Sequence, residues 1–280
     1  MRLSARQFEL SFPRPATVMG IVNVTPDSFS DGGKYLGAEE AVRRGVELAA
    51  QGAGMIDVGG ESTRPGAVPV AEAEELRRVL PVIEGLAGQV RVPISIDTMK
   101  EKVAREAVRA GASVVNDIAA NRKERRMWRL VAETGAGYVC VHMQGTPQTM
   151  QANPSYQDVV GEVRAFFVER LKELKDCGVG AEQIIFDPGI GFGKTVEHNL
   201  LLLGGLGSFL GLGRPVLVGV SRKSFLGKVT GAGAGERLPA GLACACLAVE
   251  TGVQFIRAHD VVETVRAVRM AEAILLAKRQ

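Results

Sequence analysis

The sequence predicts an α/β fold in which one (β/α)8 TIM barrel forms a single domain over residues 1–280. Eight short apolar, β-branched runs alternate with longer segments of helical period. Such alternation is typical of strands joined by right-handed helical crossovers into a parallel sheet. A length of 280 residues suits one barrel of eight units. The alternative, an open doubly wound sheet, is disfavoured because no GxGxxG follows the first run.

The predicted strands are spread along almost the whole chain. They are TVMGIVN from Thr17, GMIDVGG from Gly54, VPISID from Val92, SVVND from Ser113, GYVCVHM from Gly137, QIIFDPG from Gln183, PVLVGVS from Pro215 and QFIRAHD from Gln254. Between them, apolar residues recur at offsets of three and four, as in Val42, Val46 and Ala49, which predicts helices with one core-facing side. Ahead of the first run, QFELSF alternates weakly and predicts a short strand or hairpin over the barrel bottom.

Composition excludes several classes of protein. Hydrophobic residues make up 46% and charged residues 23%, values typical of a folded domain. The net charge of +3 comes from 34 basic and 31 acidic residues that are scattered along the chain, so no nucleic-acid partner is predicted. Without a signal-peptide pattern or an apolar run of about 18 residues, we expect a soluble, cytoplasmic protein with no membrane partner. Four cysteines without CxxC spacing predict free thiols rather than disulfides or a zinc site.

The informative feature is the polar or charged residue that ends every predicted strand. These residues are Asn23, Asp57 with Glu61, Asp97, Asn116 with Asp117, His142, Asp187, Ser221 to Lys223, and Arg257 with His259. In a (β/α)8 barrel the carboxyl ends of the strands converge on the face where active sites are built. Asn and Asp also cap helices, but capping does not explain the lysine, arginine and histidine in the set. We therefore predict an active site at this face.

The residue types suggest two subsites with different needs. Asp97, Asn116 and Asp187 suit the N–H donors of a flat heterocycle, and Lys223 suits its carbonyl oxygen. An anion such as phosphate suits the cationic groups of Arg64, Arg257 and His259, with Asn23 offering one oxygen to a metal. The two arginines could equally form surface ion pairs.

Three glycine-rich or proline-rich segments are candidates for contacts with a ligand. DPGIGFGKT from Asp187 lacks the first glycine of a phosphate loop, so an NTPase is rejected, and its Phe192 suits either ring stacking or ordinary packing. NVTPDSFSDGGKY and GESTRPGAVPV follow the first two strands and are typical of lids, or of plain connections. As lids they would bring Asp31, Thr63 and Arg64 to the site.

In order and spacing, these and other strings resemble the dihydropteroate synthase family of the folate pathway, from about Thr17 to about Val262. They are NVTPDSFSDGG, GESTRPG, SIDT, VVNDI, HMQGTPQTMQ, DPGIGFGK, VGVSRKSFLG and RAHDV. The resemblance implies condensation of 6-hydroxymethyl-7,8-dihydropterin pyrophosphate with 4-aminobenzoate, giving 7,8-dihydropteroate and pyrophosphate. It also implies Mg²⁺ as cofactor, small-molecule substrates and a homodimer formed on outer helices near the end of the chain.

The resemblance also implies roles for individual positions. The pterin contacts are Asp97, Asn116, Asp187, Lys223, Met143 and Phe192. The pyrophosphate contacts are Asn23 through the metal, Arg64, Arg257 and His259. The 4-aminobenzoate pocket comprises Phe29, Thr63, Pro65, Phe192, Lys223 and Ser224. The candidate catalytic residues are Asp31, Asp97, Arg64 and Lys223.

The chemistry favours a dissociative, SN1-like reaction, because cationic groups stabilise the leaving pyrophosphate and the dihydropterin ring delocalises positive charge. Two alternatives stay open. A corrinoid-linked pterin methyltransferase would share the pterin contacts but have no use for the pyrophosphate set. A non-catalytic pterin-binding homologue would keep the fold without turnover, which an assay of pyrophosphate release would reveal.

Overall fold

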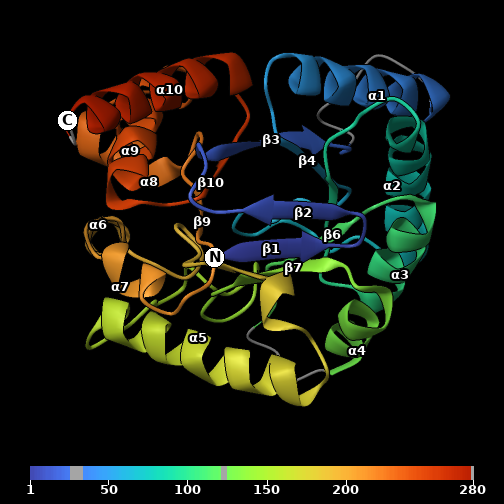
Figure 1. The fold of residues 1–280 in the computed structure, drawn as a ribbon, viewed down its shortest axis with the longest axis horizontal. Coiled ribbons are helices and arrows are strands. Elements are labelled where there is room, and N and C mark those ends of the chain that lie inside the picture. The colour runs from blue at the N-terminus through green and yellow to red at the C-terminus, as the bar shows by residue number, and fades with distance from the viewer. Residues whose placement is uncertain (26–33, 121–124, 279–280) are drawn as a thin grey trace.

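The computed structural model describes residues 1–25, 34–120 and 125–278 of the chain (Figure 1). Its strands are β1 (Arg2–Ala5), β2 (Phe8–Ser11), β3 (Thr17–Asn23), β4 (Met55–Gly59), β5 (Ile94–Asp97), β6 (Val114–Asp117), β7 (Gly137–Val141), β8 (Ile184–Asp187), β9 (Leu217–Gly219) and β10 (Phe255–Ala258). The eight strands from β3 to β10 form one parallel sheet in the order β8-β7-β6-β5-β4-β3-β10-β9. A parallel bridge between Phe186 and Val216 joins the two end strands. The predicted (β/α)8 barrel is confirmed.

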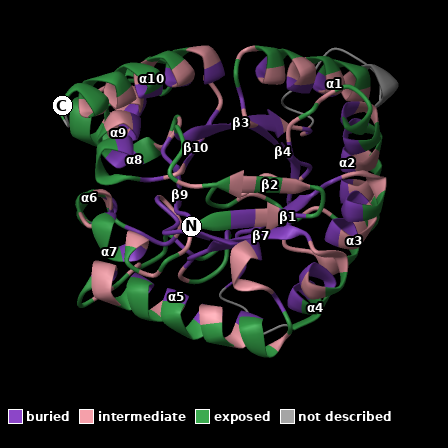
Figure 2. Cartoon of the chain, in the orientation of Figure 1, coloured by how far each residue is buried: buried purple, intermediate pink, exposed green. Residues whose placement is uncertain are grey.

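Helices surround the barrel, as the ring of coiled ribbons in Figure 1 shows. They are α1 (Lys34–Ala50), α2 (Glu72–Ala87), α3 (Glu101–Ala110), α4 (Arg125–Thr134), α5 (Val159–Asp176), α6 (Val196–Gly204), α7 (Gly207–Leu210), α8 (Ser224–Thr230), α9 (Leu238–Thr251) and α10 (Val261–Ala277). Their inward faces are apolar, as at Val103 and Ala107 of α3, both fully buried. In Figure 2 the strands of the barrel are mostly buried and the outer faces of the helices exposed. The helical periods of the sequence are thus explained by packing on the sheet.

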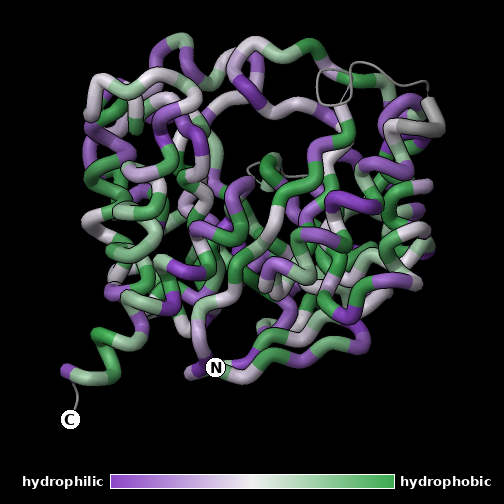
Figure 3. The backbone as a smooth tube through the Cα atoms, turned by 90° about the horizontal axis from the view of Figure 1, so that it is seen from above, coloured by the Kyte–Doolittle hydropathy of each residue, from purple (hydrophilic) through white to green (hydrophobic). Residues whose placement is uncertain are grey.

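The N-terminal hairpin closes one end of the barrel. β1 and β2 pair antiparallel, with Leu3 opposite Leu10. Leu3 packs in a buried cluster with Met19 and Phe255, which lie near the start of their strands. Figure 3 shows the barrel from the side, with the N-terminus at its lower end. The expected hairpin over the barrel bottom is confirmed, and it leaves the carboxyl ends of the strands at the opposite end of the barrel.

Side chains alternate along each strand between the barrel interior and the helices. On β5, Ile94 and Ile96 belong to the core beneath the helices, whereas Ser95 and Asp97 lie on the other face of the strand. The same alternation places Asp187 on the inward face of β8, two residues after Ile185 of the interior cluster. Parity therefore decides which strand-end residues face the barrel mouth.

One further finding concerns membranes. Over the described ranges, no helix is both long and apolar enough to cross a bilayer.

Candidate active site

Four inward-facing side chains form a hydrogen-bonded cluster inside the barrel mouth, which we call the barrel cluster: Asp57, Asp97, Asn116 and Arg257. Arg257 donates from Nε to Asp57 Oδ2 at 2.6 Å and from Nη2 to Asp97 Oδ2 at 2.8 Å. Asn116 donates from Nδ2 to the same Asp57 oxygen at 3.1 Å. Asp57, fully buried, thus connects β4 to β6 and β10. The sequence singled it out as a strand end but assigned it no role at the site.

The barrel cluster keeps several acceptors unused. Asp57 Oδ1, Asp97 Oδ1 and Asn116 Oδ1 are buried and have no hydrogen-bond partner among the described residues, and the same is true of Ser95 Oγ. Buried polar atoms normally have a partner, so a group of unpartnered ones indicates a place for a bound molecule or water. Three of the four atoms only accept, and a ligand that donates several N–H groups fits them.

Within the barrel cluster, burial and neighbouring charges bring the pKa of one carboxyl group, that of Asp97, close to neutral pH. Burial raises the pKa of Asp97 to about 7, aided by the charge of Asp57 and opposed by that of Arg257. For Arg257, the charges of Asp57 and Asp97 outweigh burial and raise the pKa, so the guanidinium stays charged. Asp97 therefore changes charge near neutral pH, in contact with a fixed cation.

Asp187 and Lys223 lie on the neighbouring side of the mouth. Asp187 Oδ1 accepts the Gly189 N–H at 2.7 Å, and burial raises the pKa of this carboxyl against the opposing charge of Lys223. Lys223 donates to the carbonyl oxygen of Ile190, and its Nζ lies 4.6 Å from the centre of the Phe192 ring. Burial lowers the pKa of Lys223 to about 8. The structure brings Asp187, Lys223 and Phe192 together as expected, and Met143 is buried.

Lys194, a buried lysine that the sequence analysis did not single out, binds the loop after β8 on the side away from the barrel cluster. Lys194 Nζ lies 3.0 Å from His142 Nδ1 and donates to the Phe192 carbonyl oxygen at 3.0 Å. The His142 ring packs edge-on against Phe166 of α5, with centres 4.9 Å apart. His142 is therefore a support for the loop and not a group of the barrel cluster. The GK pair that ends the glycine-rich stretch is the signal that could have indicated Lys194.

The predicted anion subsite lies beside the barrel cluster. His259 Nδ1 is 2.9 Å from Ser221 Oγ. Burial, together with the positive charges of Arg257, Arg222 and Arg64, lowers the pKa of His259 to about 4. Arg64 itself is an exposed side chain. Without an anion, His259 is therefore neutral at pH 7, although the sequence suggested a cation.

The remaining predicted residues divide between the mouth and the surface. Asn23 ends β3, opposite Gly59 in register, and is half-buried. Thr63 is half-buried and Pro65 exposed in the segment after β4, and Ser224 is exposed at the start of α8. Phe29 and Asp31 lie outside the described residues.

Besides His142, two more strand-end residues point elsewhere. Asp117 lies on the outward side of β6, where it accepts from Tyr138 Oη at 2.8 Å and from Ala119 N at 2.8 Å. Glu61 bonds to the Lys100 ammonium at 2.7 Å. The expectation that every strand-end polar residue serves the site is therefore too broad, because parity turns Asp117 toward the helices and Glu61 lies beyond the end of β4.

Comparison with known proteins decides the family. A family model described as "Pterin binding enzyme" matches residues 19–259. The dihydropteroate synthase of Escherichia coli (strain K12) is 47% identical over 278 residues, which cover 99% of this chain and 98% of that protein. The chain belongs to the dihydropteroate synthase family.

Solved structures of dihydropteroate synthases share the whole fold. The Xanthomonas albilineans enzyme with 4-aminobenzoic acid matches with a TM-score of 0.91 and 44% identity, over 98% of each chain. The same bacterium's enzyme in complex with 7,8-dihydropteroate matches with a TM-score of 0.88 and 42% identity, over 98% of this chain and 99% of that one.

Proposed function

We propose that this chain condenses 6-hydroxymethyl-7,8-dihydropterin pyrophosphate with 4-aminobenzoate to give 7,8-dihydropteroate and pyrophosphate. The observation that carries the proposal is the group of buried, unpartnered acceptors in the barrel mouth, on Asp57, Asp97 and Asn116. A pterin ring presents several N–H donors along its edges, which such acceptors recognise. The relatives bound to 4-aminobenzoic acid and to 7,8-dihydropteroate support the same reaction for this chain.

The pterin subsite follows from the acceptors and from Lys223. Asp187 lies within the barrel mouth at 6% exposure, where its carboxylate suits the paired N–H donors of the ring. The Lys223 ammonium suits the ring carbonyl, and its position beside Phe192 gives the ring an apolar neighbour. Because an unpartnered acceptor remains costly with any ring that lacks the matching donor, the site discriminates against such rings.

The leaving group faces the cationic side of the mouth. When the bond between the methylene carbon and the pyrophosphate oxygen breaks, the electron pair stays with that oxygen. Arg64 and Arg257 stabilise the growing negative charge. A bound anion also raises the pKa of His259 from about 4, because the anion offsets the neighbouring positive charges. The positive charge left on the pterin is stabilised by the Asp97 carboxylate, and Asp31 is the proposed second carboxylate.

The residues present fit a magnesium ion carried mainly by the pyrophosphate. The described ranges hold no group of three His, Cys, Asp or Glu side chains placed to ligate a metal. Mg²⁺ commonly takes one or two protein oxygens and completes its shell with phosphate oxygens and water. The Asn23 carboxamide, at the end of β3, would supply one such oxygen. When bound, the ion neutralises charge on the leaving group.

The second substrate attacks the methylene carbon with its amine nitrogen, and the new C–N bond forms as the nitrogen loses a proton to solvent. An arylamine is largely neutral at pH 7, so no strong base is needed. We place it against Phe29, Thr63, Pro65, Phe192, Lys223 and Ser224.

The decisive experiment is turnover of the pterin pyrophosphate with radiolabelled 4-aminobenzoate, with and without Mg²⁺. We expect labelled dihydropteroate and pyrophosphate in equal amounts, with Mg²⁺ required. Binding of the pterin without any product would identify a non-catalytic homologue. Product formed equally well after chelation of Mg²⁺ would overturn the role given to the metal and to Asn23.

We also infer a homodimer formed through α9 and α10. These helices pack together and expose Leu247, Met270, Ile274 and Leu276, which are between 51% and 63% exposed. Leu275 instead packs against the core. Exposed apolar side chains on two neighbouring helices support such an interface. Light scattering should give twice the mass of 29.7 kDa for the natural chain and a monomer for Met270→Glu. A monomeric natural chain would refute the dimer.

A cytoplasmic location is proposed because the four cysteines are free thiols.

A further inference from the structure

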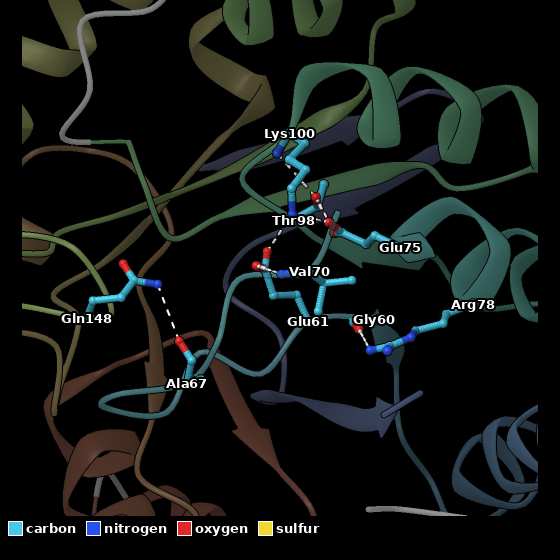
Figure 4. Close-up of polar contacts among 9 residues, drawn as sticks. All are labelled: Gly60, Glu61, Ala67, Val70, Glu75, Arg78, Thr98, Lys100 and Gln148. Carbon is cyan, nitrogen blue, oxygen red and sulfur yellow. Dashed lines mark hydrogen bonds and ion pairs between the residues drawn. The ribbon is translucent and has the colours of Figure 1, made fainter. Parts of the chain in front are cut away.

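The segment 60–70, between β4 and α2, carries Thr63, Arg64 and Pro65. Its two ends are joined by one side chain. Glu61 Oε1 accepts a hydrogen bond from the backbone N–H of Val70 at 2.8 Å, so the second residue of the segment binds its last residue (Figure 4). Through this bond the segment forms a loop whose base is set by the position of the Glu61 carboxylate.

Glu61 is held in turn by a buried group that we call the Lys100 cluster: Glu61, Glu75, Thr98 and Lys100. The Lys100 ammonium donates to Glu61 Oε2 at 2.7 Å and to Glu75 Oε2 at 2.5 Å. Thr98 Oγ1 donates to Glu75 Oε1 at 2.6 Å. Figure 4 shows these side chains converging from α2, from the loop after β5 and from the segment 60–70.

Burial makes the loss of one partner more costly here than in a surface ion pair. The side chains of Glu61 and Glu75 are 6% and 0% exposed, and that of Lys100 is 23% exposed. Exposed ion pairs contribute little to stability, whereas removing one partner of a buried pair leaves an uncompensated charge. Although burial lowers the pKa of Lys100, its hydrogen bonds to Glu61 and Glu75 raise it overall, so the ammonium stays charged. One ammonium thus contacts two buried carboxylates.

The tip of the segment is held less firmly than its base. Gly66 donates to the Pro147 carbonyl oxygen at 3.3 Å, and Gln148 Nε2 donates to the Ala67 carbonyl oxygen at 3.4 Å. Both distances are at the long end for hydrogen bonds. At the base, Arg78 of α2 adds a bond of 2.9 Å to the Gly60 carbonyl oxygen. The position of the tip therefore depends chiefly on the base.

We propose that Lys100 is a positioning residue for the second substrate: by joining Glu61 to Glu75, it fixes where the segment 60–70 places Thr63 and Pro65. Thr98, a member of the Lys100 cluster, follows Asp97 directly in the chain. The cluster therefore connects the segment 60–70 to the end of β5, where Asp97 faces the pterin subsite. Lys100 itself lies outside the barrel cluster and acts through Glu61. The identity of the second substrate as 4-aminobenzoate rests on the proposed function.

The kinetic test compares Lys100→Met with Lys102→Met. Lys102 lies nearby on α3 and pairs with Glu72 at 3.1 Å, but both side chains are well exposed. Misplacing a binding group by about 1 Å costs on the order of tenfold to a hundredfold. We expect Lys100→Met to raise the KM for 4-aminobenzoate at least about tenfold, with bare-pterin affinity within about twofold of the natural chain. Lys102→Met should change neither, and Lys100→Arg should recover part of the loss.

A second readout does not depend on the reaction. Amide hydrogen exchange measures how well the Val70 N–H is protected by its hydrogen bond to Glu61. We expect faster exchange in residues 62–70 in Lys100→Met and in Glu61→Ala, which leaves the contact of Lys100 with Glu75 in place, and unchanged exchange in Lys102→Met. If the natural chain has no turnover, the proposed function fails while this exchange result still decides the role of Lys100. Unchanged exchange, or an equal loss of affinity for both substrates, would overturn the proposal.

Discussion

Replacing Arg257 by methionine tests how the two subsites are connected. The substitution keeps an unbranched apolar stem but removes the guanidinium that lies 2.6 Å from Asp57 and 2.8 Å from Asp97. Breaking a buried ion pair by removing one partner costs about 3–5 kcal/mol. Because the Arg257 side chain is 21% exposed, we expect the lower end, about 3 kcal/mol. For a chain of this length that lowers Tm by about 6–12 °C.

The same change should also weaken pterin binding. The charge of Arg257 opposes the rise in the pKa of Asp97, which lies at about 7 in the natural chain. Without that charge the pKa rises further, so Asp97 is mostly protonated at pH 7 and no longer accepts as a carboxylate. We expect calorimetry at pH 7 to show bare-pterin affinity reduced at least about tenfold, in line with about 1.4 kcal/mol for one charge-assisted bond.

In the sequence analysis Arg257 is a contact of the pyrophosphate, and on that assignment alone its removal would leave the binding of bare pterin unchanged. The double variant Arg257→Met with Asp57→Asn serves as the control, because it removes one of the two carboxylates left without a cation. It should recover part of the lost Tm. A Tm within about 2 °C of the natural chain, together with unchanged pterin affinity, would refute the connection between the subsites.

Two further predictions concern protonation and loop geometry. Between the ordinary pKa of 3.8 for Asp97 and its raised value of about 7, the folded chain holds a proton that the unfolded chain has released. The contribution of Asp97 to the free energy of unfolding therefore falls as the pH rises from about 4 to about 7. In urea unfolding, the free energy of unfolding of Asp97→Asn relative to that of the natural chain should be higher at pH 8 than at pH 5. An equal difference at both pH values would contradict this. Gly189 has a φ of +67°, and a Cβ there would lie 1.8 Å from the His142 carbonyl oxygen, whereas at Gly213, with a φ of +70°, it would meet no atom within 4 Å. Gly213→Ala should lower the free energy of unfolding by about 1 kcal/mol. Gly189→Ala should lower it by more and, by displacing Asp187, should also lower kcat. Equal losses in the two variants would refute the argument from the close approach.

The sequence predicted the fold well because its signals are local. Each strand is an apolar run a few residues long, and each helix has its own period, so Thr17–Asn23 and its seven counterparts could be placed without knowing their neighbours. The alternation along a strand also indicates which residue faces inward, as for Asp97 and Asp187.

The partners of the site residues could not be predicted in the same way. Arg257 meets Asp57 across 200 positions of the chain, and Lys100 meets Glu61 across 39. Such contacts depend on how the barrel closes and on where a helix packs, and no periodic pattern records them. Glu75 illustrates this, because in the sequence it is one of several acidic residues in the first turn of α2, yet it is fully buried. The sequence therefore indicated which residues gather at the mouth but not how they pair.

Titration of a bare pterin, which carries no phosphate, into the natural chain and into Asp187→Asn tests most directly that the barrel mouth is a pterin subsite. A carboxamide offers one acceptor where the carboxylate offers two, and the loss of a charge-assisted hydrogen bond with a buried donor left unpaired costs on the order of 2 kcal/mol. We predict that calorimetry shows binding to the natural chain and affinity about thirtyfold weaker in the variant. Equal affinity in the two proteins, at unchanged Tm, would contradict the assignment of the subsite.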